Sequence, residues 1–329
     1  MARMTQTTRR MALAGAAAAL GVGAWRFFTA PRALTSEERQ ARHAIPLSRP
    51  ENGMQVYHLG HSLVGRDMPA FLAQIAAQAG LGEHRYHSQL GWGTSLRTHW
   101  EAGEPITGFD DMNHPPAWRD PFEALDSGAY DSLIMTEMVE LRDAIRWHDS
   151  PRYLARWAAR ARQGRADIRI YLFESWHGLD VEDGWLERLD RDPPELWEGT
   201  LLAQAMAQPD SGTIHIIPTG RVMAALVREV EGQGGMPGMA DRRDLFLRDA
   251  DGELDPIHVG DLGNYLNALV HFSVLYQRPP PIALQALLRA DGSDATLPPD
   301  ALAALMRDIC WRVVTGLPAT GLPMEGTSL

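Results

Sequence analysis

The sequence predicts an α/β fold in which a parallel sheet is covered by helices on both faces. Two observations predict it: short apolar runs recur along the chain, and segments with helical periodicity separate most of them. Parallel strands need crossover connections, and helices normally supply these while covering the sheet. The alternation extends from about residue 55 to residue 276. We therefore expect a three-layer α/β/α domain built on five parallel strands, with domain bounds at 54–278.

Five apolar runs are the candidate strands. Each is bounded by polar residues, glycine or proline, and several are rich in Val, Ile and Tyr, which favour strands. They are 55–59, 85–90, 131–137, 168–174 and 213–218.

Helical periodicity fills most of the intervals between these runs. Segment 67–79 carries Phe71, Leu72 and Ile75 at a spacing that places them on one helical face. After the proline-rich break at 279–281, the remaining residues read as a helical appendage over 279–329 rather than an independent domain. The other expected helices are 142–162, 195–207, 221–231, 258–276, 283–288 and 299–315.

The N-terminus has the pattern of an export signal. Arg9 and Arg10 precede an Ala- and Gly-rich apolar run that ends near Ala24 and is too short to span a bilayer comfortably. The paired arginines resemble a twin-arginine signal, although Met-Ala-Leu replaces the usual Phe-Leu-Lys. We expect a signal peptide over 1–33, a polar linker over 34–53, and a periplasmic or secreted protein, anchored if the signal stays uncleaved. The alternative is a basic terminus that frays ahead of an Ala-rich helix.

Composition excludes several classes of function. The net charge of −11 over 329 residues argues against a nucleic-acid-binding protein. Cys310 is the only cysteine, so neither an internal disulfide nor a thiolate zinc site can form. The sequence contains no His-Glu-x-x-His motif, phosphate loop or dinucleotide fingerprint. We expect no metal and no cofactor.

Two short motifs far apart in sequence carry the candidate chemistry. Gly60-His61-Ser62-Leu63 follows the first predicted strand, and Asp255 precedes His258 by three residues. A serine hydroxyl needs an imidazole to take its proton and a carboxylate to hold that imidazole in the right tautomer. We expect Ser62 to be the nucleophile, His258 the general base and Asp255 the acid that orients the base, with Asp255 and His258 on one loop or first helical turn.

These motifs, together with Gly263 and Tyr265 after the second one, resemble the SGNH (GDSL-type) hydrolase superfamily. The resemblance covers about residues 55 to 276, and its Asp-x-x-His block is the more specific part. It implies a flavodoxin-like sheet and a serine esterase activity. It also implies an oxyanion hole, for which we expect the backbone N–H groups of Ser62 and Gly93, with Gly91 as the second choice for the glycine.

One family block is missing. Where the family has Gly-x-Asn-Asp, this chain has Met-Thr-Glu-Met, with Glu137 in place of the usual asparagine donor. An ionised carboxylate would repel an oxyanion. We expect Glu137 to face the pocket and accept hydrogen bonds from substrate hydroxyls; the alternatives are a protonated donor in the oxyanion hole and a structural pair with an arginine.

A second polar cluster follows the fourth predicted strand. It contains Glu174, Trp176 and His177. A carboxylate beside an indole can hold a sugar ring by hydrogen bonds and stacking, so we expect these residues to bind substrate. Further stacking platforms are expected among Trp92, Trp100, Trp118 and Trp147.

The function that these observations favour is hydrolysis of small, acetyl-like acyl esters by an exported serine esterase, with carbohydrates as candidate alcohols. The expected partners are the small-molecule or carbohydrate ester and the export machinery. Two alternatives stay open. A carbohydrate O-acyltransferase would use the same triad with a sugar hydroxyl in place of water. A non-catalytic carbohydrate-binding protein would keep the fold without turnover, and the missing asparagine supports it.

Overall fold

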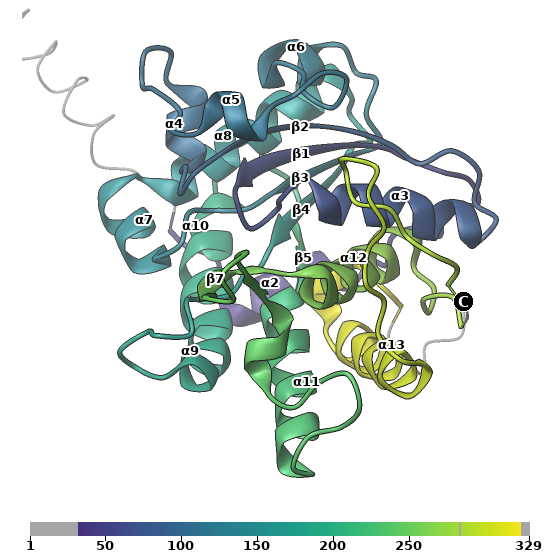
Figure 1. The fold of residues 1–329 in the computed structure, drawn as a ribbon. Coiled ribbons are helices and arrows are strands. Elements are labelled where there is room, and N and C mark those ends of the chain that lie inside the picture. Colours follow the sequence, from purple (N-terminus) through teal and green to yellow (C-terminus); the bar gives the residue numbers. More distant parts are fainter. Residues whose placement is uncertain (1–31, 283, 324–329) are drawn as a thin grey trace, which may run out of the picture. The chain divides into compact units, whose positions relative to one another are not determined.

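The computed structural model describes residues 32–282 and 284–323 (Figure 1). The predicted signal peptide falls almost entirely on residues 1–31, outside the described part of the chain. No helix in the described ranges is both long and apolar enough to cross a membrane.

A parallel sheet of five strands forms the middle layer of the fold and confirms the predicted fold class. The strand order is β2-β1-β3-β4-β5, and every neighbouring pair in it is parallel. Each predicted apolar run contains a strand, with bounds that differ by a few residues. The strands are β1 Gln55–His61, β2 Arg85–Gly91, β3 Ser132–Met135, β4 Arg169–Phe173 and β5 His215–Ile217.

Alternating side chains of the strands bury two separate apolar clusters, one on each face of the sheet. On β4, Ile170 and Leu172 belong to one cluster, whereas Tyr171 and Phe173 belong to the other. This alternation is the period-two geometry of a strand buried on both faces. It accounts for the continuous apolar runs in the sequence.

Helices complete the outer layers (Figure 1). The helices that contribute side chains to the larger cluster are α3 Asp67–Gln78, α9 Trp185–Asp192, α11 Thr219–Gly232, α12 Asp261–Tyr276 and α13 Asp300–Thr315. Those that contribute to the other are α4 Leu96–Trp100, α6 Pro121–Asp126, α7 Leu141–Trp147, α8 Ser150–Gly164, η1 Pro193–Leu202 and α10 Ala203–Ala205. Two short helices also contribute, η2 Arg242–Leu245 with Leu245 in the larger cluster and η3 Pro318–Thr320 with Ala319 in the other. The remaining short helices are α2 Ser36–His43 and α5 Phe109–Met112.

Two predicted helices have a different form in the structure. The helix expected over 142–162 is divided into α7 and α8, because Asp149 adopts a left-handed backbone conformation with φ of 52° at the start of α8. The helix expected over 195–207 begins as the π-helical segment η1, which continues directly from α9. The sequence pattern did not indicate α9.

The prediction that a helix begins at His258 is wrong for its first residues. His258 lies instead on β7 Leu254–Val259, which pairs with β6 Phe246–Arg248 in a small antiparallel sheet, and α12 begins at Asp261. The helix predicted over 283–288 is also wrong, since residues 284–288 contain no helical turn.

The segments expected to flank the domain are partly built into it. The predicted linker contains α2, whose Thr35 and Glu38 form a reciprocal capping box. The predicted appendage contains α13, whose Leu302, Met306 and Ile309 belong to the larger buried cluster. The predicted bounds of signal, linker, domain and appendage stay predictions.

Candidate functional site

Ser62 lies directly after β1, at the carboxyl edge of the sheet. β1 has β2 on one side and β3 on the other, so the chain reverses its direction of strand addition here. In open α/β sheets, ligands bind in the crevice beyond the carboxyl ends of strands at such a point. The sheet therefore presents the Ser62 hydroxyl where a ligand site is expected.

The turn that carries Ser62 is fixed from both sides by buried histidines. His61 contacts the carbonyl oxygen of Glu137 through Nε2 at 2.8 Å, and its Nδ1 accepts from the N–H of Leu63 at 3.3 Å. His99 donates from Nε2 to the carbonyl oxygen of Gly60 at 2.8 Å. Burial lowers the pKa of His61 and His99 to about 4, so both rings are neutral at neutral pH. The sequence analysis did not identify His61 or His99 as supports of this turn.

Gly60 is required by close packing. A Cβ atom at this position would come within 2.5 Å of Cγ2 of Thr136. The Thr136 side chain cannot move away freely, because its hydroxyl donates to the carbonyl oxygen of Phe173 at 2.8 Å. The glycine in the motif therefore lets β1 approach β3 closely just before the turn that carries Ser62.

Asp255 and His258 face the same point although both lie on β7. Two consecutive backbone N–H groups, of Ile257 and His258, donate to Oδ1 of Asp255 at 2.9 and 2.8 Å. This local turn overrides the alternation of a regular strand, which would otherwise place positions three apart on opposite faces. Partial burial alone would raise the pKa of Asp255, but the hydrogen bonds from His258 and Ile257 outweigh it and lower that pKa.

The three side chains form one continuous hydrogen-bonded line. Nδ1 of His258 lies 2.8 Å from Oδ2 of Asp255, and Nε2 of His258 lies 2.9 Å from Oγ of Ser62. The carboxylate can only accept, so Nδ1 carries the proton and Nε2 of the neutral ring is free to accept from the serine hydroxyl. The structure thus brings together the three residues expected to form the triad.

The segment after β4 holds the Asp255–His258 turn in place. The indole N–H of Trp176 donates to the carbonyl oxygen of Ile257 at 2.7 Å, and the N–H of Leu179 donates to that of Pro256 at 2.8 Å. Both acceptors lie between Asp255 and His258. Trp176 and Leu179 are therefore positioning residues that the sequence analysis did not identify as such; the only signal in the sequence was their place after the fourth strand.

Gly93 lies in the loop after β2, on the same edge of the sheet as Ser62. Its φ of 56° is in the left-handed region, and a Cβ built there would meet no atom within 4 Å, so the position opens to solvent. The loop ends at Ser95, whose hydroxyl caps α4 by accepting from the N–H of Thr98 at 3.2 Å.

Glu137 joins the loops that follow β2 and β3. Its Oε1 accepts from the N–H of Leu96 at 3.2 Å and from that of Met138 at 2.8 Å. The side chain has no exposed surface, and burial raises its pKa to about 7. A side chain without exposed surface cannot touch a substrate in this conformation. We therefore replace the expected contact of Glu137 with substrate hydroxyls by a role in positioning the Gly93 loop.

The cluster expected to hold a sugar ring also lies in the interior. Glu174 is fully buried with a pKa raised to about 7 by burial, and its carboxylate accepts from the N–H of Arg221 at 3.1 Å. His177 pairs through Nε2 with Oδ2 of Asp192 at 2.9 Å. Trp176 is 1% exposed. These three side chains turn inward to satisfy backbone and ionic partners, so the structure does not place them at a substrate surface.

The four tryptophans proposed as platforms differ in exposure. Trp92, beside Gly93, is 51% exposed, and Trp147 is 61% exposed with the guanidinium of Arg146 over its ring. Trp118 is partly exposed and packs edge-on against Phe109. Trp100 packs against Phe122 and Trp157 and belongs to the fold rather than to an open surface.

No group of three or more His, Cys, Asp or Glu side chains in the described ranges could hold a metal ion.

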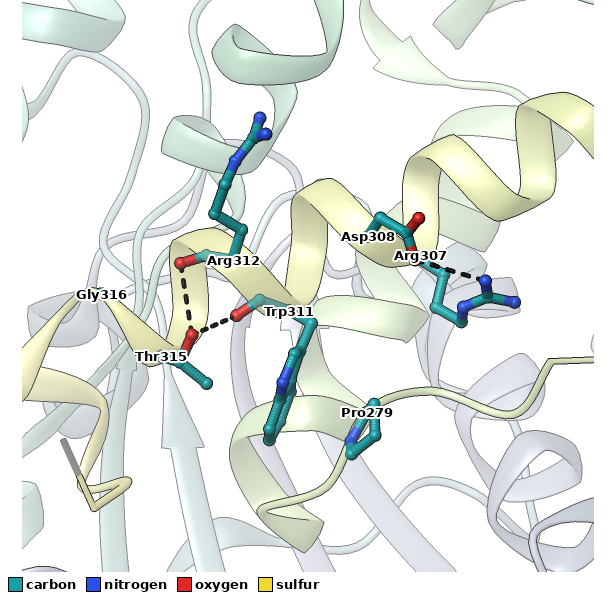
Figure 2. A pocket seen from close by; sticks show the side chains of 7 residues that line it. All are labelled: Pro279, Arg307, Asp308, Trp311, Arg312, Thr315 and Gly316. Atoms are coloured by element: carbon teal, nitrogen blue, oxygen red, sulfur yellow. Dashed lines mark hydrogen bonds and ion pairs between the residues drawn. The ribbon is translucent and has the colours of Figure 1, made fainter. Parts of the chain in front are cut away.

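A cavity of about 520 Å³ lies along α13 (Figure 2). There Trp311 lies beside Pro279, and the hydroxyl of Thr315 donates to the carbonyl oxygens of Trp311 and Arg312 at 2.8 and 3.4 Å. None of the triad residues lines this cavity.

One comparison with a solved structure supports the fold. The structure of a DUF4886 family protein from Bacteroides uniformis ATCC 8492 is similar, with a TM-score of 0.50 at 13% identity over 80% of this chain and 95% of the other. A candidate GDSL-like lipase from Parabacteroides merdae ATCC 43184 gives a TM-score of 0.42 at 14% identity, over 69% of this chain and 97% of the other. No family model matches the chain, and no curated protein matches it.

Proposed function

We propose that the protein is a serine esterase that hydrolyses small acyl esters, with Ser62 as nucleophile. The observation that carries this proposal is the line from Ser62 through His258 to Asp255, with contacts of 2.9 and 2.8 Å. Both distances fall within the reach required between nucleophile, base and orienting acid. A motif pair separated by 196 residues in sequence reaches this geometry only through the fold.

The chemistry proceeds in two balanced steps. The Oγ atom of Ser62 attacks the ester carbonyl while Nε2 of His258 takes its proton; the alcohol then leaves with that proton, and an acyl-serine remains. In the second step His258 takes a proton from water, the hydroxide attacks the acyl group, and Ser62 regains its proton from His258 as the acid leaves. Asp255 holds the ring in the productive tautomer and stabilises the imidazolium of both steps.

The negative charge on the tetrahedral intermediate needs donors. The backbone N–H groups of Ser62 and Gly93 are our candidates, since both belong to loops at the carboxyl edge of neighbouring strands β1 and β2. The exposed Trp92, next to Gly93, would form an apolar wall against the bound ester.

Partial exposure of the triad favours hydrolysis over acyl transfer to a sugar. The side chains of His258 and Asp255 are 40% and 31% exposed, so water can reach the base that activates it. A transferase must keep water away from the acyl-serine. The O-acyltransferase function therefore ranks second.

The test is hydrolysis of 4-nitrophenyl acetate, which any accessible serine esterase of this kind can accept. We expect Ser62→Ala and His258→Ala to lower kcat by about 1,000-fold or more with an unchanged melting temperature. Ser36→Ala, a substitution of an exposed serine on α2, is the matched control and should leave kcat unchanged. A purified wild-type protein that binds acetylated sugars without hydrolysing any ester would instead support the non-catalytic alternative.

We also infer that the protein is exported, from the Arg9-Arg10 pair ahead of a short apolar run. Replacing both arginines by lysine should leave the precursor in the cytoplasm if the twin-arginine route is used. Cell fractionation of the host measures the distribution. Undiminished export of the double variant would favour the general secretory route.

A further inference from the structure

We propose that a cavity beside Arg66 receives an anionic group of the ester that Ser62 attacks. This inference rests on the proposed esterase function and names a chemical class for its substrate. The cavity has a volume of about 230 Å³. It is lined by the first turn of α3, the strand β2, the segment 112–117 and Ala290.

Three hydrogen-bond donors line this cavity without a protein partner. Among the described residues, the Arg66 guanidinium forms no ion pair, and neither the Tyr86 nor the Ser88 hydroxyl forms a hydrogen bond. Ser88 is only 6% exposed. Its hydroxyl still reaches the open space of the cavity, and the Arg66 side chain is exposed, so these donors are accessible to a ligand. A bound acceptor group would satisfy all three.

The charges around the cavity favour an anion as that acceptor. None of its lining residues is an aspartate or a glutamate. The nearest carboxylate in sequence, that of Asp67, accepts from the backbone N–H of Ala290 at 2.9 Å. Burial raises the pKa of Tyr86, the Arg66 charge opposes this shift and the Asp67 charge adds to it, so the phenol stays protonated and can donate. Arg66 is also the N-cap residue of α3, a helix of 12 residues, whose N-terminus adds partial positive charge.

The cavity is close enough to Ser62 for one substrate to reach both. Arg66 is four positions after Ser62 in the chain, so their Cα atoms can be at most about 14 Å apart. The turn between them shortens this span, since the N–H of Val64 donates to the carbonyl oxygen of His61 at 3.0 Å. A substrate with its ester at Ser62 could place a charged group at Arg66 from a neighbouring sugar unit or a short acyl chain.

The size of the cavity limits the group. Its volume of about 230 Å³ corresponds to roughly eight water molecules at about 30 Å³ each. This space accepts a carboxylate or a phosphate together with part of the carbon skeleton that bears it. Arg66 would meet either oxyanion with two parallel N–H donors, a geometry that lysine cannot reproduce.

The experiment compares charged and neutral members of matched ester pairs. One pair carries the charge on the alcohol, 1-O-acetyl glucuronate against 1-O-acetyl glucose. A second carries it on the acyl group, 4-nitrophenyl hydrogen succinate against 4-nitrophenyl acetate, and a third replaces the carboxylate by phosphate, 1-O-acetyl glucose 6-phosphate. The measured quantity is kcat/KM of each charged ester divided by that of its neutral partner.

We expect the wild-type ratio to exceed one for at least one pair, and Arg66→Gln to lower that ratio about tenfold through KM. Arg66→Lys should recover only part of the loss, and Ser88→Ala should lower the ratio less than Arg66→Gln does. Arg85→Gln, which changes an exposed arginine one position before Tyr86 on β2, is the matched control and should leave the ratio unchanged. Ratios that do not respond to Arg66→Gln for any pair would overturn the inference.

Failure of this inference is distinguishable from failure of the proposed function. If the wild type hydrolyses the neutral esters and only the charge ratio is unaffected by Arg66, the anion site alone is refuted. If no ester is hydrolysed, the esterase function is refuted, and the site is tested by calorimetric titration of methyl glucuronide and of inorganic phosphate. Saturable binding that Arg66→Gln weakens about tenfold supports the site, and no binding to the wild type overturns it.

Discussion

The hydrogen bond from Trp176 to the carbonyl of Ile257 reaches the residue directly before His258. A catalytic base must be held within a fraction of an ångström of its productive position, and this is achieved by packing and by hydrogen bonds to the backbone that carries it. The indole is buried, so its N–H has no water to replace that acceptor.

Replacing Trp176 by phenylalanine tests this positioning role. The smaller ring stays apolar but leaves the Ile257 carbonyl unpaired, so the turn that carries His258 should loosen. We expect kcat for an aryl acetate to fall about tenfold with KM little changed. Trp185→Phe is the matched control, because the buried Trp185 donates to the carbonyl of His177 at 2.9 Å rather than to the His258 turn. Equal losses of kcat in the two variants would indicate general destabilisation instead.

Gly60 offers a second prediction at the scale of one residue. Gly60→Ala would place Cβ against Cγ2 of Thr136, and overpacking of this kind costs about 1–3 kcal/mol of stability. We expect a lower melting temperature and lower activity. Thr136→Ser removes that methyl group and keeps the hydroxyl that donates to Phe173, so the double variant should regain most of the loss. A double variant no more stable than Gly60→Ala would contradict the packing argument.

The hydrogen-bonded line of Ser62, His258 and Asp255 could be predicted from sequence, whereas the inward orientation of Glu137 and Glu174 could not. Ser62, Asp255 and His258 belong to short motifs with a defined chemical logic. Glu137 and Glu174 also follow strands, but a carboxylate at that position can face the crevice or turn inward to accept backbone N–H groups. Which direction the carboxylate takes depends on the backbone N–H groups of Leu96 and Arg221, which donate to Glu137 and Glu174. The fold brings these groups together from distant parts of the sequence.

At the scale of elements, the five strands of the parallel sheet could be predicted because each lies within an apolar run of the sequence. β7 was not, since Asp255-Pro256-Ile257-His258 has neither strand alternation nor an apolar run. The two N–H groups that donate to Asp255 set its conformation locally. The close approach of β7 to α12 depends on Gly263, where a Cβ would lie 2.5 Å from Cβ of Val259.

Glu137 lies after β3 and accepts a hydrogen bond from Leu96 at the start of α4, so it connects these two elements. Two substitutions distinguish the effect of its charge from the effect of its hydrogen bonds. Glutamine keeps an oxygen for the N–H groups of Leu96 and Met138, so Glu137→Gln should retain stability and most activity. Glu137→Ala leaves both donors unpaired, and we expect kcat and the melting temperature to fall together.

The comparison of these two variants on 4-nitrophenyl acetate, with thermal melts alongside, is decisive. A loss of activity in Glu137→Gln equal to that in Glu137→Ala, at unchanged stability, would show that the carboxylic acid itself takes part in the reaction. The pH profile adds a check: any inflection near pH 7 that comes from Glu137 should disappear in the glutamine variant.

At the scale of the whole molecule, the alternation of strands and helices was enough to predict the layers. It did not predict how many histidines the layers bury. His84 and His271 have pKa values lowered to about 4 by burial, and that of His58 lies well below its ordinary value for the same reason. Net charge and hydropathy carry no information about such groups, because histidine is found both in cores and on surfaces.

These histidines make the fold sensitive to acid. In the unfolded chain they bind protons below about pH 6.5, whereas in the folded chain His84 and His271 stay neutral until about pH 4 and burial also lowers the pKa of His58. Stability should therefore fall as the pH falls from 6.5 towards 4. The raised pKa values of Glu137 and Glu174 act in the opposite sense, favouring the folded state as the pH falls from 7 to 4.5, but the buried histidines outnumber them.

Thermal denaturation between pH 8 and pH 5 measures the balance. We expect the melting temperature to drop by more than about 5 °C at the acid end. His58→Leu should make the dependence on pH shallower whatever it does to the melting temperature at pH 8. His148→Ala, a change at a histidine between α7 and α8, serves as its control. A melting temperature that is constant or rises towards pH 5 would contradict this prediction.

The central claim is that the fold makes Ser62 a nucleophile. The most direct measurement is reaction of the folded protein with a fluorophosphonate probe, in which the serine oxygen displaces fluoride from phosphorus, followed by mass spectrometry of the peptides. We predict one probe per chain on the peptide that contains Ser62, no labelling of Ser62→Ala, and much slower labelling of His258→Ala. An unlabelled Ser62 in a folded wild-type protein, or a label on another serine, would contradict the claim.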